Sequence, residues 1–228
     1  MKNLRKLVII GDSAFAEVAY ECFTHDSSYE VIGFSVESAY LKKKFLFGLP
    51  VVPFESLEDH FSPKEVYFYV AIVYTQLNRL RTRLYFSAKS KGFKPATYIS
   101  GRATVWQNVV LGEHCFIFED NTIQPFVQIG SNVVLWSGNH IGHHSVIQDN
   151  CFLSSHVVVS GFCQIGQNSF IGINASIGNN VTIGNDNLIG AGITIISDTQ
   201  SNSLFKNIQP EPSKVSARRF FKVRDNET

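Results

Sequence analysis

The sequence predicts an α/β domain followed by an all-β parallel coil, in a chain of 228 residues that can bury a core without disulfide or metal staples. Three observations lead to this expectation. Apolar runs alternate with helical patterns in the N-terminal half, and aliphatic residues then recur at every sixth position. The composition, with 19 Phe, 8 Tyr, 16 Gly and one Met, suits strands and tight corners better than long helices.

The N-terminal half alternates between strand and helix patterns. We expect strands over residues 6–10, 29–34 and 66–73, and helices over 14–23 and 76–90. This order predicts a small parallel sheet. The first loop, from Gly11 to Ala16, has one glycine and lacks the other two of the dinucleotide fingerprint. It is therefore either a phosphate-binding loop at the start of a helix or a plain strand-to-helix turn.

A six-residue period governs the C-terminal half. Stepping by six from Val105 to Ile195 gives sixteen positions, all of them Ile, Leu or Val. Because these types fill about a third of the segment, chance placement has a probability of roughly one in forty million. Glycine often follows such a position, at 112, 130, 142, 166, 172, 178, 184 and 190. The period fits a short strand plus a corner, with three faces closing an 18-residue triangular coil that stacks on the next.

The charge balance excludes some classes of partner. With 20 basic and 19 acidic side chains, the chain has no global field for nucleic acid or an anionic membrane. The longest apolar run, residues 66–74, is less than half of a bilayer span, and the N-terminus has no secretory core. Four cysteines without CxxC spacing are expected to be reduced thiols, so we expect a cytoplasmic protein.

The hexapeptide pattern resembles the left-handed β-helix acyltransferases. Together with the α/β front half, the order of elements resembles bacterial sugar acyltransferases that acetylate nucleotide-linked amino sugars or sialic acid. The resemblance implies a Rossmann-like nucleotide-sugar-binding domain over residues 1–100, a left-handed β-helix acyltransferase domain over 101–198 and a tail over 199–228. It also implies a homotrimer with active sites between subunits. Six phenylalanines are then expected to line faces between subunits: Phe116, Phe118, Phe126, Phe152, Phe162 and Phe170.

Histidines of the coil are the candidate catalytic groups, since five of the seven lie there and three fall within residues 139–144. An imidazole titrating near neutrality suits a general base, whereas a cluster of histidines also suits zinc. The resemblance places the base at His143, two residues after the inward Ile141. It implies no metal, because the β-helix carbonic anhydrases have another histidine spacing and no front domain. A solvated corner residue is the plain alternative.

His144 departs from the resembled pattern, in which Asp or Glu follows the base. A neutral histidine accepts a hydrogen bond but supplies no negative charge. The orientation of His143 therefore comes from another acid (Asp149, Glu119 or Asp120) or from a backbone carbonyl, or else His144 is itself the base. His144 is accordingly the second catalytic candidate.

The resemblance also implies where acetyl-CoA and the sugar nucleotide bind. Acetyl-CoA would lie in the groove between the β-helices of two subunits, with the Gly161 amide facing the thioester carbonyl and Ile173, Ala191 and Gly192 along the cofactor. The inward cysteines Cys115, Cys151 and Cys163 are explained by packing, which favours direct transfer over an acyl-cysteine. The sugar nucleotide would contact Gly11, Ser13, Glu37, Gly48 and Tyr74.

The expected function is therefore transfer of acetyl from acetyl-CoA to the amine of a nucleotide-linked 4-amino-4,6-dideoxy sugar, in surface polysaccharide (O-antigen) or glycan assembly. Sugar O-acetylation is the nearest alternative, and a metal-dependent hydratase or a noncatalytic sugar-nucleotide binder is more remote. The sequence leaves open the nucleotide (UDP, dTDP or GDP), the sugar stereochemistry and the length of the acyl chain.

Overall fold

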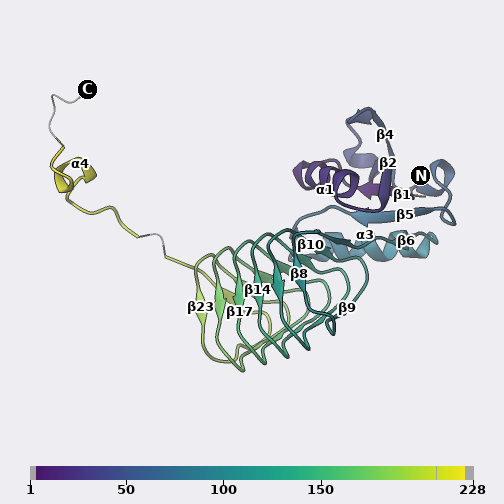
Figure 1. The fold of residues 1–228 in the computed structure, drawn as a ribbon. Coiled ribbons are helices and arrows are strands. Elements are labelled where there is room, and N and C mark those ends of the chain that lie inside the picture. Colours follow the sequence, from purple (N-terminus) through teal and green to yellow (C-terminus); the bar gives the residue numbers. More distant parts are fainter. Residues whose placement is uncertain (1–3, 209, 224–228) are drawn as a thin grey trace.

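The computed structural model describes residues 4–208 and 210–223, which form an α/β domain, a β-helix and a C-terminal tail (Figure 1). The tail leaves the last coil and carries the short helix α4 (Ala217–Phe220) away from both bodies. Residues 209 and 224–228 of the predicted tail, and residues 1–3 of the predicted first domain, lie outside the described residues. No helix in the described ranges is long and apolar enough to cross a membrane.

The α/β domain is built on a six-stranded sheet with the order β3-β4-β2-β1-β5-β6, in which every neighbouring pair except β3/β4 is parallel. Its elements are β1 (Arg5–Ile10), α1 (Ala14–His25), β2 (Tyr29–Val36), a 3-10 turn (Ser38–Tyr40), β3 (Phe45–Leu46), β4 (Leu49–Pro53), α2 (Leu57–His60), β5 (Val66–Val70), α3 (Arg79–Ser90) and β6 (Lys94–Pro95).

Helices cover both faces of this sheet, so its central strand β1 is a continuous apolar run from Leu7 to Ile10 that is buried on both sides. α1 packs on one face and α3 on the other. The expected strands and helices are present with shifted ends. α3 begins at Arg79 and not at Gln76, because residues 76–78 have positive φ angles of 52°, 50° and 66° that no right-handed helix accepts.

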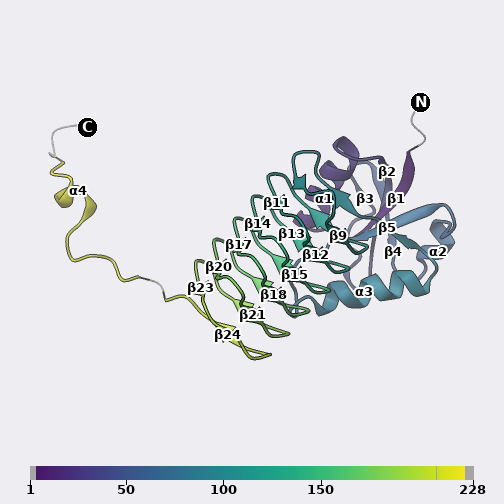
Figure 2. The same ribbon diagram turned by 60° about the horizontal axis from the view of Figure 1, so that its bottom comes forward.

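The β-helix consists of two-residue strands in three parallel sheets, with partners 18 residues apart, as in Ile123 and Ile141 (Figures 1 and 2). The first sheet contains β7 (Tyr98–Ile99), β10 (Phe116–Ile117), β13 (Val134–Leu135), β16 (Phe152–Leu153), β19 (Phe170–Ile171), β22 (Leu188–Ile189) and β24 (Leu204–Phe205). The second contains β8 (Thr104–Val105), β11 (Thr122–Ile123), β14 (His140–Ile141), β17 (Val158–Val159), β20 (Ser176–Ile177) and β23 (Thr194–Ile195). The third contains β9 (Val110–Leu111), β12 (Gln128–Ile129), β15 (Val146–Ile147), β18 (Gln164–Ile165) and β21 (Thr182–Ile183).

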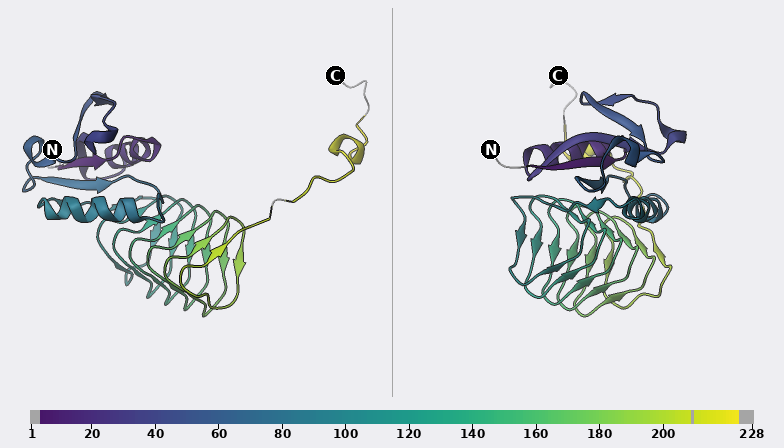
Figure 3. Two further views of the ribbon diagram at one scale, coloured as in Figure 1. Left: turned by 180° about the vertical axis from the view of Figure 1, so that it is seen from behind. Right: turned by 90° about the vertical axis from the view of Figure 1, so that its right-hand side faces the viewer.

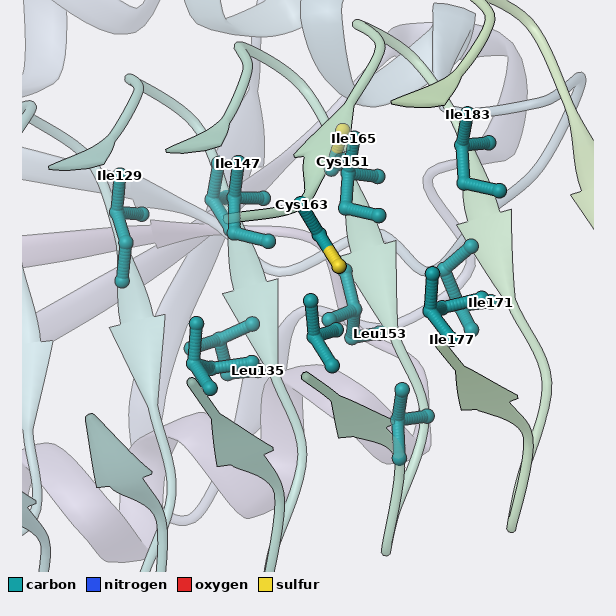
Figure 4. Close-up of a cluster of buried hydrophobic side chains, with 14 of the residues drawn as sticks. Ile129, Leu135, Ile147, Cys151, Leu153, Cys163, Ile165, Ile171, Ile177 and Ile183 are labelled. Carbon is teal, nitrogen blue, oxygen red and sulfur yellow. The ribbon is translucent and has the colours of Figure 1, made fainter. Parts of the chain in front are cut away.

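The residues of the six-residue period fill the interior of the coil. Ile129, Leu135, Ile147 and their successors stack in columns with the inward Cys151 and Cys163 between them (Figure 4). Val105 and Leu111 are only partly buried, since the end of the coil gives them fewer neighbours. The hydrogen-bonded strands begin at β7 and end at β24, so the ladders extend slightly beyond residues 101 and 198 at both ends.

From His114 to Gly192, each corner of the β-helix turns through one residue in the left-handed region, three after a six-residue position. Most of these residues are Asn, Asp, His or Gly, which tolerate positive φ. The exceptions are Phe126 (φ 65°) and Phe162 (φ 58°), whose bulky side chains are poorly suited to that region.

The α/β domain packs against the outer face of the first sheet, and both views of Figure 3 show it above the N-terminal part of the β-helix. The phenylalanines that point outward from this sheet, Phe116 and Phe152, share one core with Phe15 and Phe23 of α1. Of the six phenylalanines expected between subunits, four therefore pack toward the α/β domain of the same chain: Phe116, Phe118, Phe152 and Phe170. That expectation was wrong for these four, because the period alone does not show which face of the coil another domain covers.

Candidate functional site

His143 and His144 lie at the corner between the second and third sheets, just after β14. We call this corner, formed by residues 124–127, 142–145, 160–163 and 178–181 of successive coils, the base corner. Both histidines are exposed. The backbone N–H of His143 donates to Oε1 of Gln124 at 2.9 Å, which fixes the start of the corner.

The imidazole of His143 packs over Gly161 of the next coil. A methyl group on Gly161 would come within 2.9 Å of Cε1 and 3.0 Å of Nε2 of His143. The ring of Phe162 meets the same imidazole edge-on, with centroids 5.0 Å apart. His143 is therefore held against the coil although its side chain is open to solvent.

The two histidines contact each other through Nδ1, with 3.1 Å between the two Nδ1 atoms. The ring of His144 lies between two parallel aromatic rings, Phe126 at 4.6 Å and Phe162 at 4.8 Å between centroids. These three residues are 18 apart in sequence and form one column along the base corner. That spacing was visible in the sequence, but its significance was missed.

The acids considered as partners of His143 are engaged elsewhere. Asp149 accepts from the Ser131 N–H at 2.7 Å, Glu119 accepts from Ser137, and Asp120 pairs with Arg102. They lie at the two other corners of the coil. Within residues 4–208 and 210–223, no group of three His, Cys, Asp or Glu side chains is placed to hold a metal ion.

Gly161 lies beside His143 as expected, but its N–H donates to Oδ1 of Asn179 at 2.9 Å. This N–H is therefore free to donate to a ligand only when Asn179 gives up that hydrogen bond.

The other residues expected to bind acetyl-CoA lie at a different corner. Ile173, Ala191 and Gly192 follow strands of the first sheet, at the corner between the first and second sheets that we call the groove corner. A groove of about 210 Å³ lies there, lined by Ile173, Tyr74, Trp136 and neighbouring residues. Within one chain, the second sheet separates the groove corner from His143.

A second hollow, of about 240 Å³, opens at the carboxyl ends of β1 and β2. It brings together Gly11, Ser13 and Glu37, as expected for a ligand at the switch of a parallel sheet. Gly48 lies instead in the β3–β4 hairpin, outside this lining, and Tyr74 lines the groove corner and contacts Phe170.

Glu37 in this hollow is paired with Arg83 of α3. The guanidinium donates to both carboxylate oxygens, at 3.0 and 2.8 Å, and this pairing raises the pKa of Arg83. Tyr40 completes the outer wall. Neither Arg83 nor Tyr40 was singled out from the sequence, since Arg83 is one of several basic residues on a helix and no local pattern marks Tyr40.

The family described as bacterial transferase hexapeptide (six repeats) matches residues 126–161 and 162–196. The structure is similar to the acetyltransferase domain of PglB from Neisseria gonorrhoeae FA1090, with 24% identity, a TM-score of 0.79 and coverage of 88% of this chain and 95% of that one. It is also similar to PerB, a perosamine N-acetyltransferase from Caulobacter crescentus solved with CoA and GDP-perosamine, with 25% identity, a TM-score of 0.77 and coverage of 87% and 92%. The repeats and these folds fit a left-handed β-helix, as the family resemblance implied.

Proposed function

We propose that this chain, a hexapeptide-repeat sugar acetyltransferase, transfers the acetyl group of acetyl-CoA directly to the amine of a nucleotide-linked 4-amino-4,6-dideoxy sugar. The observation that carries the proposal is the exposed His143, whose Nδ1 is engaged by His144 while its Nε2 has no hydrogen-bond partner among the described residues. The likeness to PerB, solved with CoA and GDP-perosamine, supports the choice of co-substrate and acceptor class.

In the proposed reaction, Nε2 of His143 takes a proton from the attacking amine, the nitrogen bonds to the thioester carbon, and CoA leaves as the thiolate. The Gly161 N–H stabilises the oxyanion once Asn179 has released it. No acyl-enzyme forms.

The sugar nucleotide is proposed to bind in the hollow of the α/β domain, which we interpret as a Rossmann-like domain. The backbone N–H of Ser13, where α1 begins, suits a phosphate, and Gly11 lies beside it although its own N–H donates to the Ser35 carbonyl oxygen at 2.8 Å. The paired Glu37 and Arg83 suit recognition of the base by hydrogen bonds. Gly48 and Tyr74 remain proposed sugar-nucleotide contacts, at the hairpin and at the groove corner.

A complete site on this proposal needs more than one copy of the chain. The α/β domain covers the first sheet, and the base corner is the corner of the triangular coil opposite that sheet. His143 therefore faces away from its own nucleotide hollow. We propose a homotrimer in which the base corner of one copy meets the groove corner of the next, so that acetyl-CoA lies between them along Ile173, Ala191 and Gly192.

The test measures release of free CoA thiol from acetyl-CoA with UDP-, dTDP- and GDP-linked 4-amino-4,6-dideoxy sugars, each beside its 4-hydroxy analogue. Turnover with the amine alone supports N-acetylation. Turnover with the hydroxyl sugar alone would make the enzyme an O-acetyltransferase, which uses the same base. Hydration of CO₂ that depends on stoichiometric zinc, or binding without any thiol release, would overturn the proposal.

The role of His143 is tested with His143→Gln on the acceptor found in that panel. We expect a loss of about 10²- to 10⁴-fold in kcat with an unchanged fold, because the side chain is exposed. His25→Gln, on the outer face of α1, is the matched control and should keep full turnover. Near-normal kcat in His143→Gln would remove His143 from the mechanism.

A further inference from the structure

We infer that His144 is a positioning residue that, as a neutral imidazole, accepts the Nδ1–H of His143 and thereby holds Nε2 of His143 in the proton-accepting form. The inference rests on the proposed function only for its effect on turnover, since the arrangement of the two rings exists without substrate.

The contact between the two rings admits one proton. Two Nδ1 atoms 3.1 Å apart form a hydrogen bond only when one carries hydrogen and the other a lone pair. If His144 donated, the remaining proton of neutral His143 would sit on Nε2, and that atom would be no base. If His143 donates, its Nε2 lone pair faces solvent and an incoming acceptor.

The same arrangement accommodates the proton that catalysis delivers. When Nε2 of His143 takes the amine proton, the imidazolium still donates Nδ1–H to the neutral His144, now in a charge-assisted hydrogen bond. A further proton on Nδ1 of His144 would break this bond and place two cations in contact. The pair therefore stabilises one positive charge and opposes a second.

Among residues 4–208 and 210–223, no carboxylate forms a hydrogen bond with either imidazole. No Asp, Glu, Lys or Arg occurs in the base corner, which is formed by residues 124–127, 142–145, 160–163 and 178–181. None occurs in the equivalent corner of the preceding turn, residues 106–109. The titratable side chains of all these residues are His143, His144 and the inward Cys163, which is fully buried. Within one chain, the two imidazoles are thus the side chains of this corner that can exchange a proton with each other.

The phenylalanines on either side of His144 supply the second line of evidence. Phe126 and Phe162 are both more than half exposed, at 55% and 52%, so neither completes the interior. Both adopt left-handed φ angles that suit Asn or Gly better, and strain of this kind tends to persist where it serves a site. Their parallel rings clamp the plane of His144 and keep its Nδ1 directed at His143.

The first experiment reads the tautomers directly, by nitrogen-15 NMR of the histidines in the full-length protein without ligands, at a pH where both rings are neutral. We expect His143 protonated at Nδ1 and His144 protonated at Nε2. In His144→Phe, which keeps the ring stack but has no acceptor, His143 should become a mixture of tautomers. A wild-type His143 protonated at Nε2 would overturn the inference, whatever the enzyme acetylates.

The second experiment uses turnover. His144→Phe should lower kcat by about 10- to 100-fold with little change in KM, as loss of an orienting partner does. His144→Asn, which offers an amide oxygen and tolerates left-handed φ, should restore most of that loss. In His144→Glu the added negative charge should move the acidic limb of the kcat/KM profile to higher pH by at least about one unit.

A matched control separates the loss of the acceptor from the strain of a phenylalanine at positive φ. Asn202→Phe places the same ring at another left-handed corner (φ 61°), remote from the base corner, and should keep kcat. The inference fails if His144→Phe keeps kcat while His143→Gln loses it. It also fails if His144→Phe is inactive and His143→Gln is active, because the base would then be His144. Expected tautomers together with no transfer to any acceptor would leave the pair as inferred and refute the proposed function.

Discussion

Gly161 lies directly against the imidazole of His143, with room for a hydrogen atom and none for a methyl group, which would approach Cε1 to 2.9 Å. A Gly161→Ala substitution must therefore push the imidazole away from the coil. Because a base displaced by about 1 Å can cost roughly 10²-fold in rate, we expect a drop of that order in kcat with a nearly unchanged melting temperature.

The control for this variant is Gly178→Ala. A methyl group on Gly178 meets its nearest neighbour at 3.5 Å, an ordinary contact, and its φ is not in the left-handed region. Steady-state kinetics and thermal melts of both variants check the prediction. Equal kcat values in the two would mean that the position of His143 over Gly161 has no bearing on turnover.

The cysteines are expected to stay free of acetyl groups during turnover. Burial raises the pKa of Cys115 and of Cys151 to about 12, and Cys163 is fully buried, also with a raised pKa. A thiol in that state is a poor nucleophile. Intact-mass spectrometry after incubation with acetyl-CoA alone should show no added acetyl group, and Cys163→Ala should keep kcat. A stable adduct on any cysteine that is consumed when acceptor is added would replace direct transfer by a two-step mechanism.

The coil was predictable from the sequence because each residue of the period faces the same interior. Residues such as Ile141, Ile147 and Leu153 recur at the six-residue period, and this recurrence predicts that they are buried. The 18-residue repeat then predicts which strands pair. The hairpin β3–β4 was missed, since Pro50 and Pro53 obscure the strand pattern of β4. The docking of the α/β domain was missed too, as outward residues such as Phe116 follow no rule of the period.

The candidate site was predictable only in part, for a related reason. His143 and Gly161 are 18 residues apart, which is one turn of the β-helix, so the repeat itself predicts that they are in contact. The bond from the Gly161 N–H to Asn179 depends on a side-chain rotamer, which no spacing reveals. The pairing of Glu37 with Arg83 depends on how α3 lies across the sheet, and the sequence alone does not predict that orientation.

Arg81 should be the side chain that most stabilises the junction of the two domains. It is fully buried and donates to Oδ1 of Asn132 and to the carbonyl oxygens of Asn132, Asn150 and Cys151, at 3.1 to 3.3 Å. Burial lowers its pKa to about 10. Arg81→Ala would leave a cavity and unpaired carbonyl groups, and we expect it to cost about 3 to 5 kcal/mol in the free energy of unfolding.

Urea denaturation tests this, with two companions. Arg81→Met refills much of the volume and removes the buried charge, so it should be less destabilising than Arg81→Ala. Arg79 lies on the same helix, α3, and Arg79→Ala removes its partly exposed ion pair with Asp186 of the β-helix. This should cost at most about 1 kcal/mol. If Arg81→Ala were no worse than Arg79→Ala, Arg81 would not be the main polar contact between the two domains.

His114 makes the stability of the protein depend on pH. It is fully buried, its Nε2 accepts the Val70 N–H at 2.9 Å, and its Nδ1 lies 2.9 Å from Oδ1 of Asn132, so the neutral ring carries hydrogen on Nδ1. Burial lowers its pKa from 6.5 to about 3. Below pH 6.5 the imidazole of His114 therefore binds a proton in the unfolded chain but stays neutral in the folded protein. Its contribution to the free energy of unfolding is complete above pH 6.5 and is lost as the pH falls toward 3.

The size of this effect follows from linkage. Between pH 7.5 and 5.5 the free energy of unfolding should fall by about 1.4 kcal/mol on account of His114, a range that lies above the titration of most carboxylates. Urea denaturation at the two pH values measures it. His114→Gln, which keeps a donor and an acceptor without a titrating group, should be less stable at pH 7.5 but should lose about 1.4 kcal/mol less on acidification. Parallel losses in the two proteins would show that His114 is protonated in the folded state, and that the bond from the Val70 N–H does not hold it neutral.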